Sequence, residues 1–138
     1  MFARILIVAE PSEQCAKALP VAIDIAHRYR AELHVAVLEP VPLAPITIAE
    51  IEDARAHARS ESAPIIERAK QLARLKDVLI VTHVITGKGM QGLEELIATC
   101  RLDLLVVGSS LRPGFLERLA AAPWRLAHNL PCPVLVVK

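Results

Sequence analysis

The sequence predicts an α/β fold: an open, doubly wound sheet of five parallel strands in the order 3-2-1-4-5, with helices on both faces. Two observations predict it. Short runs of Val, Leu and Ile show little polar alternation, as expected of strands covered on both faces, and segments with helical spacing separate these runs. Right-handed crossovers between parallel strands then favour the doubly wound arrangement. A length of 138 residues fits one domain, so we expect a single domain spanning residues 1–138.

Five strands are expected from the apolar runs. They are Arg4–Ala9, Leu33–Leu38, Val78–Val84, Asp103–Val107 and Val134–Val137. The first, fourth and fifth runs have the least alternation of apolar and polar residues, which is typical of strands inside a parallel sheet.

Helical spacing fills the intervals between the strands. The expected helices run from Ser12 to about Arg30, from about Thr47 to Lys76, from Gly92 to Arg101, and through Trp124, Leu126 and Ala127 to near Asn129. Ser12 is the residue type of an N-cap. Pro20 is expected to kink the first helix and Pro64 to divide the second, because a proline inside a helix removes a backbone hydrogen bond and crowds the preceding turn.

Charge and cysteine content exclude several classes of protein. The 16 basic and 15 acidic residues give a formal charge of +1, which predicts no binding to nucleic acid, and no segment has the roughly 20 apolar residues of a membrane helix. The short apolar run near Met1 fits a first strand better than a signal peptide, so we expect a cytoplasmic protein. Cys15, Cys100 and Cys132 are far apart in the sequence and are expected to be buried, reduced thiols.

The sequence contains no catalytic or metal-binding motif. The five histidines have no partners at metal-ligand spacing, so structural or surface roles are expected for His27, His34, His57, His83 and His128. Gly87-Lys88-Gly89 lacks the remainder of a phosphate loop and is expected to be the turn into the third helix. No serine lies in a Gly-x-Ser-x-Gly sequence. We therefore expect no metal site and no catalytic residues.

A ligand site is expected where the chain reverses direction across the sheet, between strands one and four. Ligands bind in such folds beyond the carboxyl ends of the strands at this point. Two segments meet there, Glu10-Pro11-Ser12 and Gly108-Ser109-Ser110.

The segment from Asp103 to Phe115, the opening from Ile5 to Ser12, and the tail from Leu130 to Val137 together resemble the universal stress protein family over essentially the whole chain. Members that bind nucleotides carry Gly-x-x-Gly after the fourth strand, then nine residues, then Gly followed by Ser or Thr. Here Gly108 matches the first glycine. The resemblance implies that an Asp after the first strand binds the ribose, and Glu10 stands in that position.

This chain departs from the nucleotide-binding pattern at several positions. Leu111 replaces the second glycine, and the closing pair falls on Ala121 and Ala122, or one residue earlier in an alignment made from the tail. Pro11 also lacks the backbone amide that another residue would offer a phosphate. The departures resemble the branch of the family that does not bind ATP tightly, so an eroded nucleotide site is favoured, although ATP or AMP binding stays open.

The candidate nucleotide-contacting residues are Glu10, Pro11, Ser12, Gly108, Ser109, Arg112 and Gly114. Arg112 has the fork geometry that holds a phosphate, but a solvent-exposed arginine without a ligand is the alternative. Gly108 serves either direct ligand contact or a tight turn that needs a positive φ. Glu10 binds ribose or is a solvated carboxylate that caps the following helix.

The resemblance implies a homodimer in which the last strand, Pro133 to Lys138, pairs with its copy, with Val134 and Val136 near the two-fold axis. Burial of that strand within its own subunit is the alternative.

The leading hypothesis is a non-enzymatic, regulatory stress-response dimer that contacts protein partners. Two alternatives stay open. One is a nucleotide-binding module with a rearranged loop, and the other is a sensor of another small molecule, for which Leu111 and Phe115 make the crevice more apolar.

Overall fold

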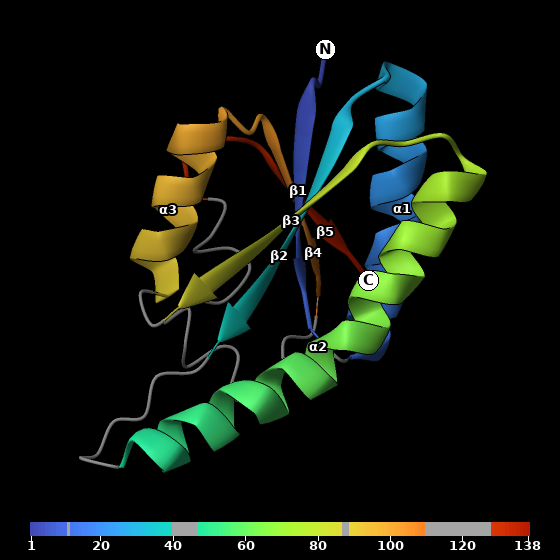
Figure 1. Cartoon of the computed structure of the whole chain (residues 1–138). Helices are drawn as coiled ribbons and strands as arrows, with labels where there is room; N and C mark the ends of the chain where they lie inside the picture. The colour runs from blue at the N-terminus through green and yellow to red at the C-terminus, as the bar shows by residue number, and fades with distance from the viewer. Residues whose placement is uncertain (11, 40–46, 87–88, 110–127) are drawn as a thin grey trace.

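The computed structural model confirms the α/β sheet predicted from the sequence, and it describes residues 1–10, 12–39, 47–86, 89–109 and 128–138. Five strands form one parallel sheet in the order β3-β2-β1-β4-β5. Helices α1 and α2 lie on one face of this sheet and α3 lies on the other (Figure 1). The elements are β1 Arg4–Ala9, α1 Glu13–Tyr29, β2 Glu32–Glu39, α2 Ile48–Leu75, β3 Ile80–Thr86, α3 Gly89–Cys100, β4 Leu104–Gly108 and β5 Val134–Val137.

Strand β1 lies at the centre of the sheet. Ile5 pairs with Leu33 of β2 on one side and with Leu104 of β4 on the other. The side chains of Ile5 and Leu6 are fully buried on opposite faces of the sheet, Ile5 beneath α1 and Leu6 beneath α3. Burial on both faces is the reason that this strand shows no polar alternation.

Helix α1 begins at the predicted cap. The hydroxyl oxygen of Ser12 accepts a hydrogen bond from the amide of Cys15 at 3.1 Å, and Ser12 itself is extended. The helix continues through Pro20 and ends at Arg30, whose left-handed φ of 54° closes the last turn. Tyr29, the last residue of the helix, is half exposed and packs edge-on against Phe2.

Helix α2 corrects the expectation that Pro64 divides the second helical segment. The segment forms one helix that contains Pro64, although its direction changes along its length (Figure 1). A proline removes one backbone hydrogen bond, and water can hydrate the freed carbonyl because this part of the helix is exposed, so the chain bends and stays helical. The helix ends as predicted, with Lys76 as its C-cap, but the following strand does not begin at Val78. Asp77 takes a φ of 56° and the amide of Val78 bonds back to Ala73, so β3 begins at Ile80.

Helix α3 begins at Gly89, three residues before the predicted start, and covers the second face. Leu93 and Ile97 of this helix are buried against Leu6, Leu105 and Val107. Of the fourth predicted helix, only His128 and Asn129 are described, and both are helical; Trp124, Leu126 and Ala127 lie outside the described residues. None of the helices in the described ranges has the length and apolar character needed to cross a membrane.

Candidate functional site

The carboxyl ends of β1 and β4 lie side by side, as the predicted crevice requires. The two strands pair from Ile5 with Leu104 to Ile7 with Val106. The chain after β1 continues to Glu10 and Ser12, and the chain after β4 continues to Ser109, whose amide donates to the carbonyl oxygen of Val137 at 2.8 Å. The structure therefore places the described part of both candidate segments at the same edge of the sheet. Pro11, Ser110, Leu111, Arg112, Gly114, Phe115, Ala121 and Ala122 lie outside the described residues.

Glu10 is buried, with 4% of its surface exposed, so the alternative of a solvated carboxylate that caps α1 is wrong. Ser12 is the cap, and the amide of Ser12 donates to the carbonyl oxygen of Glu10 at 2.8 Å. Cys15 lies close to this carboxylate. Burial raises the pKa of the Cys15 thiol, a backbone hydrogen bond at Glu10 lowers it, and the negative charge of Glu10 raises it further.

Gly108 does not adopt the positive φ expected of a tight turn. The first turn of α1 packs against it instead. A Cβ atom at position 108 would lie 2.8 Å from Cβ of Gln14 and 2.9 Å from its carbonyl carbon. The absence of a side chain at this position is therefore required by the packing of α1 on the end of β4.

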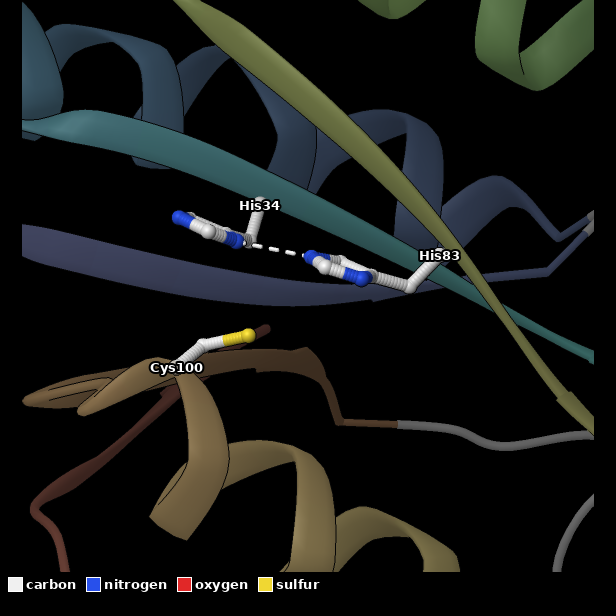
Figure 2. Close-up of side chains that lie close together, drawn as sticks. All are labelled: His34, His83 and Cys100. Atoms are coloured by element: carbon white, nitrogen blue, oxygen red, sulfur yellow. Dashed lines mark hydrogen bonds between the residues drawn. The ribbon is translucent and has the colours of Figure 1, made fainter.

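A second cluster of polar side chains lies away from this crevice. His34 of β2, His83 of β3 and Cys100 at the end of α3 lie together on the α3 face of the sheet (Figure 2). Nδ1 of His34 and Nε2 of His83 are 2.7 Å apart, a hydrogen bond in which one ring donates and the other accepts, and the two rings are nearly parallel. The sulfur of Cys100 points toward the two rings in Figure 2.

Both imidazoles of this cluster favour the neutral form. Burial lowers the pKa of His34, and the neighbouring His83 lowers it further, against the opposing effect of Glu32. Burial also lowers the pKa of His83. The sequence spacing does not reveal this pair, because the two histidines are 49 residues apart and only the pairing of β2 with β3 brings them together.

The other two cysteines are free and buried, as predicted, while Cys100 is half-buried. Burial raises the pKa of Cys132, and the carboxylate of Asp103 raises it further.

Comparison with known proteins agrees with the resemblance seen in the sequence. The Universal stress protein family pattern matches residues 1–138. The universal stress protein YxiE of Bacillus subtilis is 28% identical over 148 aligned residues that cover the whole of both chains. The universal stress protein MJ0531 of Methanocaldococcus jannaschii is also 28% identical, over the whole of this chain and 83% of its own.

Two solved structures show the same fold. A universal stress protein in complex with cAMP has a TM-score of 0.74 at 21% identity, covering 99% of this chain and 97% of its own. A universal stress protein family protein from Arabidopsis thaliana with AMP bound has a TM-score of 0.62 at 15% identity, covering 99% and 91%. The match to the family over its full length means that this chain belongs to the Universal stress protein family.

Proposed function

We propose that this chain is a non-enzymatic, regulatory member of its family, a homodimer that contacts protein partners and whose nucleotide site is eroded. The burial of Glu10 supports the proposal that the nucleotide site is eroded. A carboxylate that binds ribose hydroxyls must reach the ligand, but only 4% of the Glu10 surface is exposed. In this proposal Glu10 holds the end of β1 and the start of α1 together and does not bind a sugar.

The positions that would surround a phosphate support the same proposal. Leu111, Ala121 and Ala122 stand where the nucleotide-binding pattern has Gly, Gly and Ser or Thr. A Cβ atom at the two glycine positions keeps backbone amides from approaching phosphate oxygens, and alanine lacks the hydroxyl that Ser or Thr would offer. Gly108, the one glycine that matches, is accounted for by its contact with α1.

Calorimetric titration with ATP, ADP, AMP and cAMP tests the eroded site. We expect no heat of binding up to millimolar nucleotide for the wild-type protein. The combined variant Leu111→Gly, Ala121→Gly and Ala122→Ser is the matched gain-of-function control, and it is expected to acquire affinity for ATP. Micromolar binding by the wild-type chain would refute the proposal.

Nucleotide binding through a rearranged loop is the second candidate function. It is favoured by the two similar structures that hold cAMP and AMP. Of the residues that this function would use, Ser12 follows β1 and Ser109 follows β4, two strands that pair with each other. Preference for AMP or cAMP over ATP in the same titration would favour this candidate, because a site with a weak phosphate cradle gains least from additional phosphates.

The dimer part of the proposal is supported by the position of β5 at the edge of the sheet. The strand exposes Val136, with 36% of its surface accessible, and an apolar sheet edge is a surface that proteins usually cover. Pairing of two β5 strands across a two-fold axis would cover it. Residues Pro133 to Lys138 would form the contact.

Analytical ultracentrifugation tests the dimer. We expect the wild-type chain to sediment as a dimer at micromolar concentration and Val136→Lys to sediment as a monomer. Val84→Lys is the matched control, because Val84 is an exposed valine on β3, the opposite edge of the sheet. A monomeric wild-type protein, or a Val84→Lys variant that dissociates as readily as Val136→Lys, would count against pairing through β5.

A further inference from the structure

Three side chains with metal-binding chemistry converge from three separate elements. His34 comes from β2, His83 from β3 and Cys100 from the end of α3, and one potential ligand atom of each lies within 4.8 Å of the others. His34 is buried and the other two are half-buried. Imidazole nitrogen and thiolate sulfur are the donors that zinc prefers. The cluster is separate from the crevice at the ends of β1 and β4.

The register of the sheet explains why the two histidines meet. His83 is opposite Ala36 in the ladder between β2 and β3, so His34 lies two residues away along β2 and on the same face. Cys100 packs against the apolar cluster on that face, which includes Leu6 and Ala36. The rigid elements that carry the donors therefore hold all three in place before any ion binds.

The separations suit a tetrahedral ion after small movements. Zinc lies about 2.0 Å from nitrogen and 2.3 Å from sulfur, so neighbouring donors in a tetrahedral site are about 3.3 to 3.6 Å apart. Here Nδ1 of His34 and Nε2 of His83 are 2.7 Å apart, and the sulfur of Cys100 lies within 4.8 Å of one nitrogen of each ring. The histidine nitrogens must separate by about half an ångström and the thiol must move closer to them, which rotation of the side chains can accomplish.

A carboxylate lies where it favours the required tautomer of His34. Within the described part of the chain, Nε2 of His34 is buried and makes no hydrogen bond, and an oxygen of Glu32 lies 3.9 Å from it. Glu32 is itself paired with Arg4 at 3.3 Å. The negative charge favours a proton on Nε2 of His34, which leaves the lone pair of Nδ1 directed at His83. Glu32 is thus a positioning residue for the ring of His34.

We propose that Nδ1 of His34, Nε2 of His83 and the sulfur of Cys100 bind one zinc ion, with a fourth position open to water or another ligand. On binding, the Cys100 thiol releases its proton to solvent as its sulfur bonds to the ion. The proton on Nε2 of His83 is replaced by a proton on Nδ1 of the same ring. Two neutral imidazoles and one thiolate then hold the ion, and one proton is released for each zinc bound. The bound ion would join α3 to β2 and β3.

Cobalt titration of the tag-free, chelator-treated full chain tests this site. Co²⁺ replaces zinc in such sites, and a cobalt–thiolate bond produces a charge-transfer absorption band that reports sulfur ligation. We expect one Co²⁺ per chain with this band, its displacement by one equivalent of Zn²⁺, and protection of Cys100 from alkylation by Zn²⁺. Absence of the band in the wild-type chain would overturn the proposal.

Matched variants assign the ligands. Cys100→Ala is expected to lose the charge-transfer band and at least about 100-fold in zinc affinity, and His83→Gln to lose at least about 10-fold. The controls are Cys132→Ala, which removes a buried thiol from the same face, and His57→Gln, which removes an exposed imidazole from α2. Circular dichroism checks that each variant is folded. Zinc affinity that survives Cys100→Ala, or that disappears equally in Cys132→Ala, would overturn the assignment.

Discussion

Replacing Gly108 with alanine separates packing from ligand binding as the reason for this glycine. The added Cβ atom would lie 2.8 Å from Cβ of Gln14, 2.9 Å from its carbonyl carbon and 3.1 Å from its carbonyl oxygen. These atoms belong to the first turn of α1, so they cannot move aside as the end of a flexible side chain does. Relief of the contact requires α1 to shift away from the end of β4.

The size of the effect follows from two opposing terms. Forcing an extra methyl group into a packed site costs about 1 to 3 kcal/mol of unfolding free energy. Alanine also restricts the unfolded chain relative to glycine, which returns about 0.4 to 1 kcal/mol because φ of Gly108 is not in the left-handed region. We expect a net loss of about 1.5 kcal/mol, which for a domain of this length lowers the melting temperature by about 5 °C.

Urea denaturation followed by circular dichroism measures this loss. Ser109→Ala is the matched control, since it changes the next residue of the same segment and is expected to alter the unfolding free energy by less than about 0.5 kcal/mol. A Gly108→Ala protein as stable as the wild type would refute the packing explanation. If that variant also lost affinity for a nucleotide that the wild type binds, ligand contact would be the reason for the glycine.

Three further predictions concern the cap, the sheet and the thiols. Ser12→Ala removes the hydroxyl that accepts a hydrogen bond from the amide of Cys15, and it should lower the unfolding free energy by about 1 kcal/mol. Ser12→Asp is the conservative replacement. Equal stability of Ser12→Ala and the wild type would contradict the capping role. The carboxylate of Asp103 accepts from two backbone amides at the start of β1, at 2.8 and 3.2 Å. Asp103→Ala leaves both amides without this partner and should lower the unfolding free energy, measured by urea denaturation, by about 1 to 2 kcal/mol. Asp103→Asn should lower it less. Iodoacetamide should label Cys100 before Cys15 and Cys132, because burial hides both and raises the pKa of both thiols. Since the unfolded chain then loses these two thiol protons at lower pH than the folded chain, their contribution to stability is complete at neutral pH and falls as the pH rises through the alkaline range. Labelling of Cys15 at the rate of Cys100 would contradict both the predicted order of labelling and the predicted pH dependence of stability.

Most of the fold could be predicted because its determinants are local. Strand β1 is an uninterrupted apolar run between a charged start and a buried glutamate, and the structure gives it the predicted bounds. The predicted start of β3 is wrong because a helix-capping hydrogen bond competes there with the local strand signal. Val78 and Leu79 read as strand, but Val78 is used to close the end of α2, and β3 therefore starts two residues later.

Topology alone could predict that the segments after β1 and β4 lie at the same edge of the sheet, but it could not reveal the His34–His83 pair. No sequence pattern relates two histidines that are 49 residues apart. Detection requires the register of β2 against β3, which one residue of slippage would reverse by turning His83 to the other face of the sheet. The register depends on how both strands pack, so it cannot be predicted from the sequence of either strand alone.

Two features that resemble a nucleotide site are required by the fold itself. Gly108 admits the first turn of α1, and Ser12 caps that same turn, so both are needed whether or not a ligand enters the crevice. Their presence is therefore no measure of nucleotide affinity. Our proposal rests instead on the sequence at Leu111, Ala121 and Ala122, where the nucleotide-binding pattern of the family has Gly, Gly and Ser or Thr. In our proposal the chain keeps the glycine that packing demands and lacks those that only a phosphate would need.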